Sequence, residues 1–135
     1  MKRILDRGLE ALRPTALVIE VGEVAGPKER ISAEAGVVMW EHQDHGGVIT
    51  ARRVMPTDAE WALFWTQLET ADFWRWDEYY ADGPHNGYEW KVQVTFPGFS
   101  RTSSGCNAYP GQPRSEAWQV FWREVCLLAQ PPTAA

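Results

Sequence analysis

A short segment rich in histidine and acidic residues offers the side chains that bind divalent metals. It contains Glu41, His42, Asp44 and His45 and ends in two glycines. Imidazole and carboxylate groups ligate zinc and related ions, and the tip of a hairpin can present them together. No second ligand pair with zinc-like spacing is found, and His85 is the only other histidine. We therefore predict a solvated turn and no metal or other cofactor, with His42, Asp44 and His45 kept as alternative metal ligands.

Cys106 could act as a nucleophile, because a thiolate becomes reactive once a neighbouring base or a helix amino terminus lowers its pKa. It stands between Gly105 and Asn107, where a strand is expected to end, and the sequence places no base beside it. The structural interpretation is a small, half-buried thiol at a turn. Ser103 and Ser104 lack the Gly-x-Ser-x-Gly setting of an esterase nucleophile. We therefore predict no catalytic residue.

Four acidic side chains in the second half of the chain could supply the paired carboxylates of acid–base catalysis. They are Asp72, Asp77, Glu78 and Asp82. Carboxylates in polar loops are usually solvated, and spacing alone does not set a pKa. The glycines form neither a Gly-x-Gly-x-x-Gly nor a Gly-Lys-Ser/Thr loop that would cradle a phosphate. The sequence therefore leans against an enzyme.

Residues 70–87 have no regular period but are rich in aromatic side chains. Trp74, Trp76, Tyr79 and Tyr80 lie close together there. The chain has 8 Trp, 4 Tyr and 5 Phe, more ring surface than one sheet with a single helical layer easily hides. Trp and Tyr are enriched in binding hot spots. Two interpretations stay open: the rings form a binding surface, or they plug one end of the sheet.

A turn near the end of the chain adds two binding candidates. Asn107 can bond its own backbone in an Asx-turn, and Gly105 can supply a positive φ or a close backbone approach. Pro110 would fix the exit of the turn, and Tyr109 could anchor it on the sheet. These properties favour a folding role. The alternative is that Asn107 and Tyr109 line a pocket together with the Trp-rich loop.

Three features of the second half of the chain carry a resemblance. They are Trp90-x-Val92-x-Val94, Gly105-x-Asn107-Ala108-Tyr109-Pro110, and a last helix with Trp118, Phe121 and Trp122. With a capped aromatic helix and a Trp-rich loop before them, they resemble short bacterial proteins that share this order of features. The resemblance covers roughly residues 57–129 and implies no catalytic role, so no function is carried over.

Hydrophobic alternation marks the strands that must position these residues. Between Tyr88 and Phe96, apolar and polar side chains alternate without exception, which predicts a strand with one apolar face. Further strands are expected over residues 15–24, 31–40 and 48–55. A polar return strand is expected after the Pro-Gly turn that follows Phe96.

Helix signals are clearest at two places. Thr57 and Glu60 fit a capping box, and aromatic residues at three- and four-residue steps continue that helix to near Thr70. Ser115 can cap a last helix, whose apolar face runs to Ala129. Both helices have an aromatic stripe suited to packing on a sheet.

The predicted elements form an α+β fold: a single antiparallel sheet of about five strands with two or three helices packed on one face. With 135 residues, the chain is expected to form a single domain, 1–135. Residues 1–13 should form a short helix. Residues 130–135 contain two prolines and should form a flexible tail.

Composition narrows the partners. A formal net charge of −5 and scattered basic residues argue against binding to nucleic acid and to an anionic membrane surface. No apolar run reaches the roughly 20 residues of a membrane span. The two cysteines are too few for a disulfide framework, which predicts a cytoplasmic protein with reduced thiols. The sequence does not fix the oligomeric state.

We expect a small non-catalytic bacterial binding protein, of immunity or accessory type, that uses its aromatic surface. A protein partner of basic character would suit the acidic chain, since complementary fields speed and select association. The alternative is a small enzyme or ligand-binding protein with an aromatic pocket near Cys106, Asn107 and Tyr109.

Overall fold

The computed structural model describes residues 14, 16–23, 26–81, 87–96, 99–110 and 116–129. Their elements, in chain order, are β1 (Ala16–Glu23), β2 (Lys28–Glu34), β3 (Val37–Gln43), β4 (Ile49–Val54), α1 (Asp58–Thr70), the 3₁₀ turn η3 (Phe73–Arg75), β5 (Tyr79–Ala81), β6 (Tyr88–Phe96), β7 (Phe99–Cys106) and α2 (Glu116–Ala129). The predicted helix over 1–13 and the predicted tail over 130–135 lie outside the described residues.

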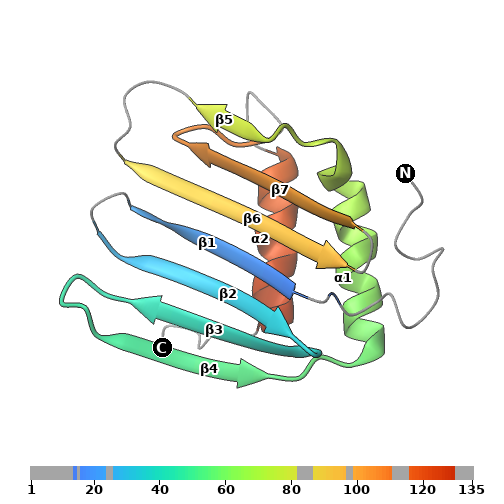
Figure 1. Cartoon of the computed structure of the whole chain (residues 1–135), viewed down its shortest axis with the longest axis horizontal. Helices are drawn as coiled ribbons and strands as arrows, with labels where there is room; N and C mark the ends of the chain where they lie inside the picture. The colour runs from blue at the N-terminus through green and yellow to red at the C-terminus, as the bar shows by residue number, and fades with distance from the viewer. Residues whose placement is uncertain are drawn as a thin grey trace.

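The strands form one sheet in the order β4-β3-β2-β1-β6-β7-β5. The α+β prediction of a single sheet with helices on one face is confirmed, but the sheet has seven strands and not about five. Neighbouring strands are antiparallel except for β5, which runs parallel to β7. Figure 1 shows α1 and α2 lying across the strands on the same face of the sheet.

The centre of the sheet is the pair β1 and β6. Leu17 lies opposite Val94 and Ile19 opposite Val92, and all four side chains are fully buried. The predicted alternation is confirmed in β6 from Trp90 to Phe96, where the apolar residues pack into the core and polar residues alternate with them on the other face, whereas Tyr88 at its start is 52% exposed. Burial of these aliphatic side chains stabilises the centre by about 1.5–3 kcal/mol each.

The strand predicted over residues 31–40 is in fact a hairpin. Ala35 and Gly36 form its turn with φ values of 53° and 82°, the positive values that a tight two-residue turn requires. Glycine adopts such a φ at no steric cost. The turn ends β2 and reverses the chain into β3, so the core residues change from odd-numbered Ile31 to even-numbered Val38.

The two edges of the sheet hold one correction and one confirmed strand. The segment 70–87, predicted without regular structure, contains η3 and β5, a strand of 3 residues. At the opposite edge, the strand predicted over 48–55 is β4, and most of its side chains are exposed. Both β4 and β5 have a neighbouring strand on one side only. Their formation therefore depends on pairing with that neighbour and not on a strong local pattern.

Both predicted helices are confirmed. The Thr57 hydroxyl accepts a hydrogen bond from the Glu60 N–H at 3.1 Å, and the Glu60 carboxylate accepts one from the Thr57 N–H at 3.0 Å. This capping box starts α1, which ends at Thr70 as expected. The buried stripe of α2 includes Phe121 and Val125, and it packs beside α1 over the sheet.

All eight tryptophans lie in or against the core between the helices and the sheet. The buried ones are Trp40, Trp61, Trp65, Trp76 and Trp90. The partly buried ones pack against this core; they are Trp74, Trp118 and Trp122. Five of the eight indoles are therefore hidden in this layer, while three keep part of their ring surface exposed. Two aromatic helix stripes facing one apolar sheet face provide enough room.

Candidate binding face of the sheet

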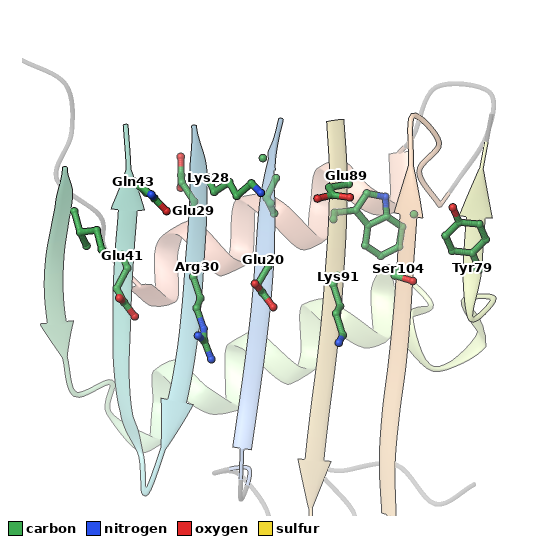
Figure 2. Close-up of a pocket in the computed structure, with 15 residues that line it drawn as sticks. Glu20, Lys28, Glu29, Arg30, Glu41, Gln43, Tyr79, Glu89, Lys91 and Ser104 are labelled. Atoms are coloured by element: carbon green, nitrogen blue, oxygen red, sulfur yellow. The ribbon is translucent and has the colours of Figure 1, made fainter. Parts of the chain in front are cut away.

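The face of the sheet turned away from the helices, which we call the open face, carries a row of charged side chains. Glu41, Arg30, Glu20 and Lys91 lie opposite one another on the neighbouring strands β3, β2, β1 and β6. Their signs alternate from strand to strand, and we call these four residues the charged row. Figure 2 shows the four side chains lying side by side, one on each strand.

The charged row continues into polar and aromatic residues towards β5. Ser104 lies opposite Lys91, and Tyr79 lies opposite Ser104. The Tyr79 side chain is 56% exposed. At the other end, Ala51 of β4 lies opposite Glu41. The line of residues across the open face is therefore charged in the middle, small at one end and aromatic at the other.

A hollow of about 500 Å³ lies on the open face, and all four members of the charged row line it. Lys28, Gln43 and Glu89 belong to the next line of residues across the sheet and border this hollow (Figure 2). Gly22 stands between Lys28 and Glu89 in that line. A Cβ atom at Gly22 would lie 2.5 Å from the Pro27 carbonyl oxygen, so backbone forms the floor there.

The members of the charged row do not form close ion pairs with one another. Among the described residues, no ion pair within 4.0 Å joins any two members of the row. Glu20, Arg30 and Lys91 are exposed, and Glu41 is half-buried. Alternating signs on adjacent strands avoid the repulsion of like charges directly opposite each other. The four groups can therefore form ion pairs with a surface of matching pattern.

Trp76, Tyr80 and Tyr109, three of the predicted binding residues, surround the Trp90 indole inside the protein. Their ring centroids lie 6.0, 5.9 and 6.2 Å from that of Trp90. Trp76 is 4% exposed, whereas Tyr80 and Tyr109 are half-buried. The Trp76 Nε1 donates a hydrogen bond to the Ala71 carbonyl at 3.0 Å. These rings belong to the helix side of the sheet, so the plug interpretation describes their packing.

The Trp-rich loop is also fastened to β7 by hydrogen bonds. The Ser103 hydroxyl donates to the Asp77 carbonyl at 2.6 Å, and the Arg101 guanidinium donates to the Trp76 carbonyl. Trp74 is half-buried and stacks on Trp65 with ring centroids 6.2 Å apart. Of the four rings predicted in this loop, Tyr79 alone points to the open face.

Asn107 has a structural contact of its own. It adopts φ of 57°, its Oδ1 accepts a hydrogen bond from the Tyr88 N–H at 3.1 Å, and its N–H donates to the Tyr88 carbonyl at 2.9 Å. Asn107 therefore joins the end of β7 to the start of β6. Gly105 provides the expected close approach, because a Cβ there would lie 2.6 Å from the Trp90 Nε1.

The Tyr109 phenol and the Cys126 thiol have raised pKa values. Burial raises the pKa of Tyr109, and the charges of Tyr88 and Cys106 raise it further. Burial and the Glu29 carboxylate raise the pKa of Cys126. The Cys106 side chain is 3% exposed, and both cysteines are free. A raised pKa at Cys126 is the opposite of what a catalytic thiol needs, and burial keeps Cys106 away from a substrate.

The candidate metal ligands take part in local contacts. The His42 ring stacks on Trp40, and its Nδ1 lies 3.9 Å from the Glu29 carboxylate. Asp44 Oδ1 accepts hydrogen bonds from the backbone N–H groups of residues 46 and 48, while His45 is exposed. Within the described ranges, no three His, Cys, Asp or Glu side chains are placed to hold one metal ion.

No family model matches the chain, and no curated protein matches it. The resemblance of residues 57–129 to short bacterial proteins stays a prediction. Neither α1 nor α2 is long and apolar enough to cross a membrane, and this holds for every helix in the described part of the chain.

The charged row was missed by sequence reasoning. Its members lie on four strands, and only the pairing register brings Glu20, Arg30 and Lys91 together. The available signal was the polar half of the alternation in each strand, such as Glu89 and Lys91 between apolar residues of β6. That signal predicts a solvated face but not which charges are neighbours.

Proposed function

We propose that this chain is a small non-catalytic interaction protein that binds a protein partner through the open face. The observation that carries the proposal is the charged row, with its four alternating and mutually unpaired charges on adjacent strands. Exposed ion pairs contribute only about 0–1 kcal/mol each in water, so such a row adds little to folding. Complementary charges on a partner would fix its register and select it against others.

The size of the open face supports protein binding. Seven strands about 4.8 Å apart and roughly six residues long make a face of about 600 Å². A partner of equal area would bring the total buried surface to roughly 1,200 Å², the lower limit of standard-size interfaces. Tyr79 supplies an exposed ring at one edge, the kind of side chain that acts as a hot spot. The aromatic contribution expected from the sequence would thus come from Tyr79.

The surroundings of the residues predicted to line an aromatic pocket support a non-catalytic role. Cys106 is buried, and Asn107 holds the start of β6. Tyr109 is stacked on Trp90 with a raised pKa. These three residues therefore stabilise the fold through burial, hydrogen bonding and ring stacking. The two free cysteines support the cytoplasmic location expected from the sequence.

A second candidate function is the binding of a small zwitterionic ligand in the hollow. Its volume of about 500 Å³ falls within the range of roughly 300–1,000 Å³ typical of ligand sites. Lys28 and Glu89, from opposite sides of Gly22, would face the two charges of such a ligand. Titration calorimetry with free amino acids tests this: heat that Lys28→Glu abolishes supports it, and no heat opposes it.

The proposed protein binding is tested by site-specific photo-crosslinking in cells of the source organism. A benzophenone amino acid is placed at Thr102, an exposed position of β7 on the open face. The matched control carries it at Thr66, an exposed position of α1. A covalent protein adduct from position 102 and none from position 66 is expected. Absence of an adduct at 102, or the same adduct from both positions, would refute the proposal.

A further inference from the structure

The charged row is complementary to itself. Read from β3 to β6 its signs are minus, plus, minus, plus for Glu41, Arg30, Glu20 and Lys91, and in the opposite direction every sign is reversed. We propose that the partner of the open face is a second copy of this chain, which forms a two-fold symmetric dimer. This inference rests on the proposed use of the open face and names its occupant.

A two-fold axis parallel to the strands, between β1 and β2, brings two open faces together. This rotation keeps the direction of the strands and reverses their order, so β1 lies over the partner's β2 and β6 over the partner's β3. Arg30 then meets the partner's Glu20, and Lys91 meets the partner's Glu41. Because a two-fold contact occurs twice, four ion pairs form from four residues of each copy.

The residues beside the charged row fit the same axis. Towards the hollow, Lys28 lies over the floor at the partner's Gly22, and Gln43 lies over the partner's Glu89. On the other side of the row, Val18 meets the partner's Ser32. The rotation places no like charges over one another in these lines.

An axis at this position also buries most of the open face. Between β1 and β2 it has three strands on one side and four on the other, so β5 with its exposed Tyr79 stays outside the overlap. A second copy therefore binds through the charged row and does not use the Tyr79 ring as a hot spot. Stacked sheets pack about 10 Å apart with strands within about 30° of each other, a gap that Arg–Glu and Lys–Glu pairs can bridge. The six overlapping strands of each copy cover about 500 Å², so the buried total is about 1,000 Å², which is just enough for a specific dimer of modest affinity.

Charge reversal at the centre of the row tests the proposal. Sedimentation equilibrium of the wild-type chain should show a dimer that weakens as salt is raised, because the pairs are ionic. Arg30→Glu puts a like-charge contact at two places in the dimer and should raise the dissociation constant at least about 100-fold. The double variant Arg30→Glu/Glu20→Arg restores opposite charges across the axis and should return to within about tenfold of wild type.

Two controls keep the result interpretable. Arg75→Glu reverses an exposed charge in η3, outside the open face, and should leave the dissociation constant unchanged. Circular dichroism and the Tm of each variant show whether it is folded. A folded double variant that stays as weak as Arg30→Glu would overturn the proposal, as would a wild-type chain that is monomeric at about 100 μM.

The crosslinking experiment separates this inference from the proposed function. In the dimer, Thr102 lies over the partner's Arg53, so the adduct should have twice the mass of the chain and join β7 to β4. An adduct with a different protein would refute the dimer and leave the proposed function standing. No adduct at Thr102 would refute both.

Discussion

Trp76→Ala should destabilise the protein by about 3–5 kcal/mol, the usual cost of truncating a buried tryptophan. The indole is 4% exposed. Its neighbours, with ring centroids 5.1, 5.2, 6.0 and 6.2 Å away, are Phe73, Phe121, Trp90 and Trp118 respectively. Truncation leaves a cavity among these four rings. It also removes the Nε1 donor that bonds the Ala71 carbonyl at 3.0 Å.

The loss can be measured by thermal unfolding followed by far-UV circular dichroism. For 135 residues the entropy of unfolding is about 0.3 kcal/mol/K, so the expected decrease in Tm is roughly 10–18 °C. The Tyr79 side chain, three positions after Trp76, is 56% exposed, so Tyr79→Ala should destabilise the protein by under about 1 kcal/mol. Trp74→Ala should fall between the two because its ring is half-buried.

Trp61→Ala provides the reference for a core tryptophan, since its side chain is fully buried. If Trp76→Ala stays within about 1 kcal/mol of wild type while Trp61→Ala loses 3 kcal/mol or more, then Trp76 is not part of the core. The plug interpretation of the Trp-rich loop would then be wrong. The binding-surface interpretation of that loop would regain its support.

Two further predictions follow from the geometry. Gly22→Ala should lower the free energy of unfolding, measured in urea, by about 1–3 kcal/mol, because the new Cβ would lie 2.5 Å from the Pro27 carbonyl oxygen. The control Gly46→Ala should change this free energy little, because its Cβ meets no atom closer than 3.4 Å. The folded-state pKa of Tyr109 is raised above its ordinary value of 10.0, so its contribution is complete below pH 10 and is lost as the pH rises through the folded pKa. Urea unfolding between pH 9 and pH 11 should therefore decline less steeply in Tyr109→Phe than in wild type; equal slopes would contradict this.

Local patterns determined which parts of the fold could be predicted. The alternation in β6 and the capping box at Thr57 act within a few residues, so they gave one strand and the start of α1 correctly. The hairpin at Ala35 and Gly36 was missed because small and apolar residues alternate straight through it. The strand β5 was missed because its 3 residues pair with β7, a partner about 25 positions away.

The open face could not be predicted for a related reason. Arg30 and Glu41 are neighbours only because the turn at residues 35–36 sets the register of β2 against β3. Lys91 joins the row only through the pairing of β1 with β6. By contrast, Trp76 and Tyr79 were identified as candidates, but burial, which depends on tertiary packing, placed them on opposite sides of the sheet.

The pairing of β1 with β6 has a consequence for the kinetics of folding. This pairing joins positions about 65–80 residues apart, so the centre of the sheet forms only when a long loop closes. Such non-local pairing slows folding towards milliseconds to seconds. During synthesis, Leu17 and Ile19 emerge well before Val92 and Val94, which later lie opposite them. The nascent chain must therefore wait with one edge of β1 unpaired, and this is the stage at which a chaperone would be of most use.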